Sequence, residues 1–156
     1  MLSLAGRTTS HEEGIDLLKT LIENGQAYEK FIELVASQGG DVEVVKDMNL
    51  LPKAPLTYEY KSKSAGYISH LSAMDIGLAS VKLGAGRETK ESPIDHSAGI
   101  VLSKKVGTKV AVGETLAVLH ANDETFFAKA EAYMDMAYTF SETKPIKQPL
   151  IFKTIR

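Results

Sequence analysis

The spacing of apolar residues near the start of the chain predicts short helices. Apolar residues recur there at intervals of three and four, the period of a helix with one buried stripe. In the first helix the stripe consists of Ile15, Leu18, Leu21 and Ile22. Ser10 and Glu13 form the S-x-x-E pattern of a capping box, so this helix is expected to begin near His11. It should stop at Asn24-Gly25.

Two further helices are predicted before residue 52. The second covers about 26–37 and ends at Gly39-Gly40. Its stripe consists of Ala27, Phe31, Leu34 and Val35. Asp41 can cap a short third helix, which the stretch 49–52 then breaks with its proline.

The pattern changes from helical to strand-like between Pro52 and Pro55. Residues 57–61 and 66–71 both have strand-like patterns, and the four polar or small residues between them favour a turn. This arrangement predicts a β-hairpin.

Helices and short strands alternate through the rest of the chain. Ser72 can cap a helix that ends at Gly84, with Gly77 allowing a close neighbour. Its expected stripe is Met74, Leu78 and Val81. Strands are predicted over 99–102 and 115–120, and then Asp123 can cap another helix. The inward residues of that helix are Phe127, Ala130, Met134 and Ala137.

The end of the chain is predicted to be extended. Residues 138–141 have a strand pattern, and 150–152 are expected to form an edge strand or a docked extension after Pro145 and Pro149. The predicted class is α+β, with a helical segment at 1–55 and a mixed, β-rich domain at 56–156.

Composition narrows the class of protein. The 156 residues are 44% hydrophobic and carry a net charge of −2, which indicates a globular chain with a core and no polyanion-binding surface. No nucleic-acid or membrane partner is expected, because there is no basic arm and no apolar run of about 20 residues. Zero cysteines exclude disulfides and thiolate chemistry and are compatible with the cytoplasm, the default location.

Gly84-Ala85-Gly86-Arg87 invites a phosphate-binding interpretation, since glycines let backbone amides approach an anion. The context favours a helix cap and tight turn instead, because these glycines close a helix rather than open one. The charged loop that follows, with Glu88, Lys90 and Glu91, is ordinarily a solvated surface; a loop that closes on a ligand is the sharper alternative.

The histidines do not predict a metal or catalytic centre. None of His11, His70, His96 and His120 has the spacing of metal ligands. Asp95, His96 and Ser97 are adjacent, but the members of a catalytic triad converge from separate parts of a fold.

A glycine rhythm follows at 106–116, where the residues have the pattern V-G-x-x-V-x-x-G-x-x-L and include Val106-Gly107 and Val112-Gly113. This pattern resembles that of lipoyl and biotinyl domains, in which such glycines form the turns between strands of a barrel sandwich. A carrier needs a lysine beside methionine at a hairpin tip, and Lys104 and Lys105 lack that neighbour. The rhythm therefore favours a barrel-sandwich (hammerhead-like) pattern, with a carrier or non-catalytic docking module as the alternative function.

An ordered set of motifs resembles the C-terminal domain of pyrimidine-nucleoside phosphorylases and thymidine phosphorylases. These motifs are Gly77-Leu78-Ala79, residues 82–87, Ile94-Asp95, residues 99–102, Val106-Gly107, Val112-Gly113-Glu114 and residues 119–122, with residues 4–7, 29–31 and 38–41 upstream. The resemblance implies a homodimeric pentosyltransferase that cleaves uridine or thymidine with inorganic phosphate, giving the free base and a pentose 1-phosphate.

The same resemblance implies that this chain is only the C-terminal part of such an enzyme. The helical residues would then belong to a larger α/β lobe, and the phosphate- and pyrimidine-binding residues would lie outside the chain. No catalytic, substrate-binding, metal or cofactor residue is therefore assigned here, with phosphate as a co-substrate only. The chain alone is expected to be inactive and to self-associate, and Gly84, Gly86, Arg87 and Asp95 form a possible closing loop.

Overall fold

The computed structural model describes residues 1–149, 151–153 and 155. It divides into two compact units, 1–51 and 52–156, and each is described by itself.

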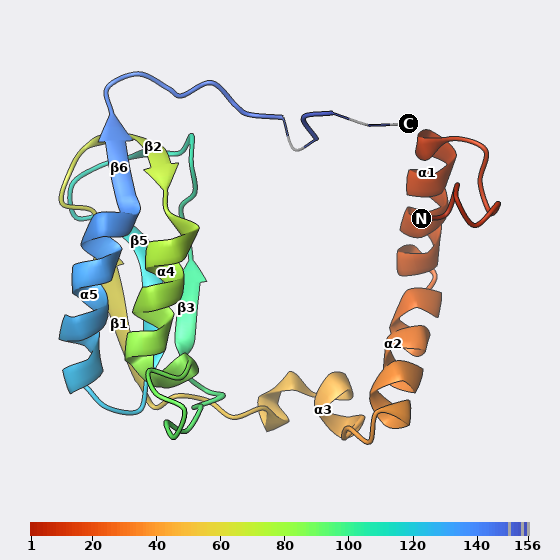
Figure 1. The fold of residues 1–156 in the computed structure, drawn as a ribbon, viewed down its shortest axis with the longest axis horizontal. Helices are drawn as coiled ribbons and strands as arrows, with labels where there is room; N and C mark the ends of the chain where they lie inside the picture. Colours follow the sequence, from red (N-terminus) through yellow and green to blue (C-terminus); the bar gives the residue numbers. More distant parts are fainter. Residues whose placement is uncertain (150, 154, 156) are drawn as a thin grey trace. The chain divides into compact units, whose positions relative to one another are not determined.

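The first unit is helical, with α1 (His11–Glu23), α2 (Gln26–Ser37), α3 (Glu43–Lys46) and a short 3-10 turn, η1 (Met48–Leu50) (Figure 1). Ser10 caps α1 as predicted, because its Oγ accepts a hydrogen bond from the Glu13 amide at 3.1 Å. The Glu13 carboxylate reaches one residue further back than in a standard capping box. It accepts bonds from the backbone and hydroxyl of Thr9, at 2.8 and 2.7 Å.

The apolar stripes of α1 and α2 form, but they are not buried. Leu18, Phe31 and Leu34 are 50%, 50% and 54% exposed. Among the described residues of this unit, only Thr8 and Gly14 are buried. This exposure is expected for helices that would pack against a larger lobe, because a pair of short helices offers no second layer to cover their stripes.

The second unit contains two antiparallel three-stranded sheets that share one hydrophobic core. The first has the order β1-β5-β3, built from β1 (Leu56–Lys61), β5 (Thr115–Ala121) and β3 (Gly99–Leu102). The second has the order β4-β2-β6, built from β4 (Lys109–Val110), β2 (Gly66–Leu71) and β6 (Tyr138–Ser141). The described strands form these two sheets and no closed barrel.

The predicted hairpin is wrong, because β1 and β2 lie in different sheets. β1 pairs with β5, with Leu56 opposite Ala121. The central strand β5 has fully buried side chains, so it needs a neighbour on each edge, and β1 and β3 supply them. Between β1 and β2, Ser62 exchanges backbone hydrogen bonds of 2.8 Å with Gly113 and Glu114, which redirects the chain into the second sheet.

The helix α5 (Thr125–Ala137) and the helix α4 (Ala73–Ser80) lie side by side on the first sheet (Figure 1). The predicted inward face of α5 is confirmed. Its buried residues are Phe127, Ala130, Met134 and Ala137. Tyr58 of β1 stacks on Phe127, with 5.5 Å between ring centroids.

The predicted stripe of α4 is wrong. Met74 is 73% exposed and Leu78 is 38% exposed, whereas Ala79 and the following Leu83 are fully buried. The small Ala79 side chain faces the core beside α5 and Ile76 packs against that core, so Met74 and Leu78 face outward. A Cβ added to Gly77 would have no neighbouring atom within 4 Å, so this glycine does not serve a close approach.

The tail after β6 forms no strand in the residues that the structure describes. Ile151 and Phe152 are 64% and 78% exposed, so the predicted edge strand is wrong there; Leu150 lies outside the described residues. Within the described ranges, no helix has the length and apolarity needed to cross a bilayer.

Candidate functional site

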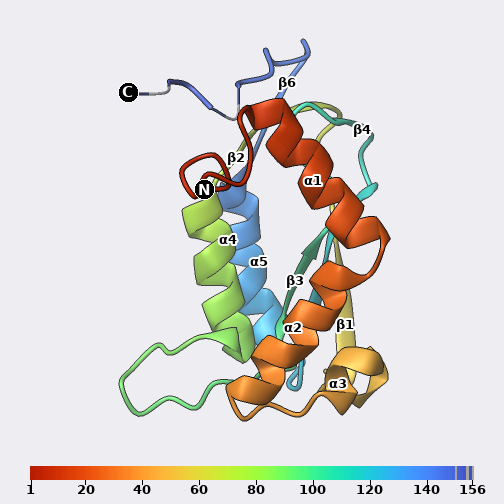
Figure 2. The same ribbon diagram turned by 90° about the vertical axis from the view of Figure 1, so that its right-hand side faces the viewer.

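The candidate site lies where the chain leaves α4. The helix ends in a single π turn, η2 (Val81–Ala85), inside which Gly84 has a φ of +102°. An L side chain rarely adopts this conformation, so glycine is favoured at the turn as predicted. Gly86 is needed for a different reason, since a Cβ there would lie 2.8 Å from Cγ2 of Val81. Beyond it the loop projects away from the helices before it returns to β3 (Figure 2).

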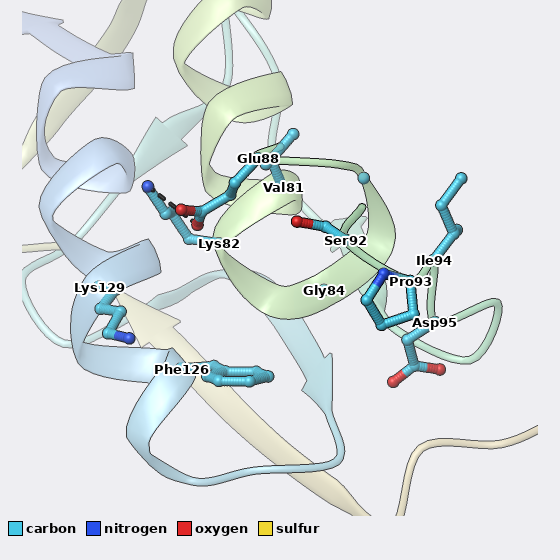
Figure 3. A pocket seen from close by; sticks show the side chains of 11 residues that line it. Val81, Lys82, Gly84, Glu88, Ser92, Pro93, Ile94, Asp95, Phe126 and Lys129 are labelled. Carbon is cyan, nitrogen blue, oxygen red and sulfur yellow. Dashed lines mark hydrogen bonds and ion pairs between the residues drawn. The ribbon is translucent and has the colours of Figure 1, made fainter. Parts of the chain in front are cut away.

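The loop and the start of α5 enclose a pocket of about 290 Å³ (Figure 3). Its lining residues come from η2, the loop and α5: Val81, Lys82, Gly84, Gly86, Glu88, Ser92, Pro93, Ile94, Asp95, Phe126 and Lys129. The structure thus brings together three of the four residues expected in a closing loop. The fourth, Arg87, is exposed and does not line the pocket.

Asp95 anchors the return limb of the loop. Its amide donates to the Gly84 carbonyl at 2.9 Å, which joins the two ends of the loop. Its Oδ1 accepts hydrogen bonds from the hydroxyl of Ser97 at 2.6 Å and from the Ser97 amide at 2.9 Å. Its Oδ2 accepts a short bond from Asn122 Nδ2. The bonds from Ser97 and then Asn122 hold the pKa of the Asp95 carboxyl below its usual value.

Two lysines border the pocket, and each already has a partner. Lys82 Nζ lies 2.9 Å from Glu88 Oε1, an ion pair drawn as a dashed line in Figure 3. The hydrogen bond from Lys82 to Glu88 raises the pKa of Lys82. Lys129 Nζ lies 5.6 Å from the centroid of the Phe126 ring, a cation–π contact. With two cations and two carboxylates, the formal charges of the lining balance.

The histidines do not assemble into a centre. His70 and His120 line two other hollows, and His96 is exposed beside the Asp95–Ser97 hydrogen bond without joining it. Within the described part of the chain, no three His, Asp or Glu side chains are grouped so that they could hold a metal ion.

The glycine rhythm forms turns, as predicted. Gly107 and Gly113 have φ values of +87° and +82°, and each sits beside a short strand. Lys104 is not a free hairpin-tip lysine: its Nζ lies 2.6 Å from Glu114 Oε1, and its side chain is 30% exposed. This pairing argues against Lys104 as a carrier lysine.

Sequence reasoning missed the partners of Asp95 and the cation–π pair. Asn122 is 27 residues from Asp95, and it reaches the loop only because β5 ends there. A D-x-S spacing typical of an Asx turn is a usable signal for Ser97. No such local signal places Phe126 and Lys129 beside the pocket, because their positions depend on how α5 packs.

Comparisons with known proteins agree with the motifs. Residues 67–141 match the family described as pyrimidine nucleoside phosphorylase C-terminal domain. The chain is 52% identical over 124 residues to the pyrimidine-nucleoside phosphorylase of Staphylococcus haemolyticus (strain JCSC1435), covering 80% of this chain and 29% of that protein. It is 47% identical over 122 residues to those of Staphylococcus aureus strains bovine RF122 / ET3-1 and USA300, covering 78% of this chain and 28% of each.

The chain therefore spans less than a third of the length of these relatives. The matched region contains the pocket-forming loop, both helices α4 and α5, the second sheet except for Gly66, and the strands β3 and β5 of the first. Residues 67–141 form a pyrimidine nucleoside phosphorylase C-terminal domain, and the chain is homologous to the C-terminal part of pyrimidine-nucleoside phosphorylases.

Proposed function

We propose that this chain works as the C-terminal part of a cytoplasmic pyrimidine-nucleoside phosphorylase, a pentosyltransferase. The enzyme would cleave uridine or thymidine with inorganic phosphate to a free base and a pentose 1-phosphate. The observation that supports this most is the match of residues 67–141 to the C-terminal domain of that family.

In this proposal the reacting groups come from outside the chain. Phosphate would attack the anomeric carbon as the base leaves, and the developing charge would be stabilised by groups of the remaining polypeptide. The coverage supports this, since over two thirds of each relative lies beyond the matched region. The chain alone is then expected to be inactive, and the enzyme needs no cofactor besides its co-substrate.

A phosphorolysis assay on the chain tests this division of roles. Uridine and thymidine are each incubated with phosphate and the chain, and release of the free base is followed. No release above the protein-free rate is expected. Measurable turnover would mean that the catalytic groups lie within these 156 residues.

The loop between Gly84 and Asp95 is proposed to close beside the substrate cleft of the complete enzyme. Three features support a moving segment: glycine-dependent turns at one end, an anchored carboxylate at the other, and an exposed middle. Arg87 at the exposed part would reach toward the cleft on closure.

Replacing Arg87 with alanine in the complete enzyme tests the closing role. A loss in kcat, a rise in KM, or both is expected, because a contact made on closure is removed. Lys90→Ala, in the same exposed stretch, controls for a general effect of charge. If Arg87→Ala leaves both constants unchanged, the loop does not act through this residue.

The first unit is proposed to be part of a larger α/β lobe of a homodimeric enzyme. The exposed faces of α1 and α2 support this, since apolar stripes at helical spacing normally pack against another layer. The two sheets are proposed to form the barrel-sandwich pattern. Their shared core and the stacked rings of Tyr60 and Tyr138, 6.0 Å apart, support such packing.

A lipoyl- or biotinyl-like carrier or a docking module is the alternative. Intact-mass measurement after expression tests the carrier function, because a carrier would show a covalent adduct on Lys104 or Lys105. An unmodified mass is expected.

A further inference from the structure

The loop 87–94 is joined to the rest of the domain by very few polar contacts. Thr89 and Ser92 bond to each other, through a Ser92 amide to Thr89 carbonyl bond of 3.1 Å and a hydroxyl pair at 2.9 Å. Among the residues that the structure describes, the one hydrogen bond or ion pair from this loop to its surroundings is Lys82 to Glu88. A single polar contact from outside the loop therefore restrains its exposed middle.

Both ends of the loop are fixed more firmly than its middle. Gly84 and Gly86 set the path of the outgoing limb, and the bonds of Asp95 to Gly84, Ser97 and Asn122 hold the returning limb. Residues 87–91 are exposed. A segment with fixed ends and an unsupported middle can swing as a flap about those ends.

We propose that the Lys82–Glu88 ion pair is a latch that holds the loop 87–94 against the pocket of Figure 3 and frees it when the pair breaks. The side chains of Lys82 and Glu88 are 26% and 50% exposed, so water and salt compete with the pair. Such a pair contributes little compared with a buried one, which suits a contact that must open and close. The latch adds a release mechanism to the proposed closing loop. Only its effect in the complete enzyme rests on that proposed role.

Limited trypsin digestion of the chain measures the latch directly. Trypsin cuts after Arg87 and Lys90, which both lie in the exposed part of the loop. Lys82→Met removes the latch without changing the sequence of the loop. Cleavage at both bonds is expected to speed up about two- to fivefold, since an exposed ion pair is worth little and cleavage follows the open population.

The matched control is Lys129→Met, which removes the other lysine of the pocket but leaves the latch intact. It is expected to cleave at the wild-type rate. The proposal is overturned if Lys82→Met also cleaves at the wild-type rate, or if Lys129→Met accelerates cleavage equally.

A second variant covers the case in which Lys82→Met unfolds the domain, seen as cleavage at lysines throughout the chain. For the Glu88→Gln variant, the rate of cleavage after Lys90 is then measured. This rate is divided by the cleavage rate of a synthetic peptide of residues 84–95 that carries the same substitution, which corrects for the effect of the new sequence on trypsin itself. The same two- to fivefold rise, of about the size expected for an exposed pair, supports the latch, and an unchanged ratio overturns it. Because no nucleoside is involved, this result is independent of the phosphorolysis assay.

Discussion

At the scale of single residues, the core of the 52–156 unit contains two buried tyrosines. Tyr60 and Tyr138 are 4% and 6% exposed. The Tyr60 hydroxyl donates to Asp135 Oδ1 at 2.8 Å, and Lys63 Nζ lies 2.7 Å from the same carboxylate. Burial raises the pKa of both tyrosines, that of Tyr138 to about 12. Both hydroxyls therefore keep their protons to a higher pH in the folded domain than in the unfolded chain.

The raised pKa of Tyr138 predicts a loss of stability at alkaline pH. The unfolded tyrosine gives up its proton near pH 10, before the folded one. The stabilisation is complete below pH 10 and is lost as pH rises from about 10 to about 12, by at most about 1.4 kcal/mol per pH unit. Urea unfolding across this range should show a shallower decline for Tyr138→Phe than for wild type.

Tyr67→Phe is the control for this measurement, since Tyr67 lies half-buried in β2 of the same unit. It shows how far the loss of one tyrosine hydroxyl alters the measurement without a change at position 138. Equal slopes for Tyr138→Phe and wild type would show that Tyr138 ionises alike in the folded and unfolded chain.

The candidate site can be predicted only in part from its residues. Gly84, Gly86 and Asp95 are accessible to sequence reasoning because glycine and a carboxylate beside a turn have local meanings. The exposed Arg87 is adjacent to them in sequence, but the structure leaves it outside the pocket. Asn122 is not predictable, because its contact with Asp95 depends on how β5 is placed against the loop.

At the scale of elements, local sequence patterns predict nearly every helix and strand. They do not predict which strands pair or which helix face packs against the core. The inward face of α5 follows from a 3.6-residue period and is confirmed. The β1–β2 hairpin fails because strand pairing depends on tertiary context, and β1 pairs with the largely buried strand β5 instead of its neighbour in sequence. The predicted face of α4 fails because its packing against α5 places Ala79 and Ile76 toward the core instead of Met74 and Leu78.

Two glycines near the end of α4 predict opposite effects of alanine. Gly77 lies inside the helix with open space around a Cβ position, so Gly77→Ala should stabilise the domain by about 0.5–1 kcal/mol. Gly84 has a φ of +102°, which an L side chain rarely adopts, so Gly84→Ala should cost about 1–2 kcal/mol. Urea unfolding measures both, and the same sign for the two variants would contradict this assignment.

At the scale of the molecule, the first unit carries apolar surface that the described chain does not cover. Exposed apolar stripes of this kind favour association. Light scattering should show an average mass that rises with concentration. Leu34→Glu should lower that rise, because it places a charge within the stripe, while Gln26→Glu adds the same charge at a polar position outside the stripe and should not. A strict monomer over a wide concentration range would contradict the expectation.

Phosphorolysis by a hybrid enzyme measures the role of this chain in a phosphorylase most directly. In the Staphylococcus haemolyticus enzyme, the homologous C-terminal region is replaced by residues 1–156 of this chain. The hybrid is expected to release base from uridine or thymidine in the presence of phosphate. The same enzyme truncated before that region and the present chain alone are expected to release none. A folded hybrid without turnover, or turnover by the chain alone, would contradict the assigned role.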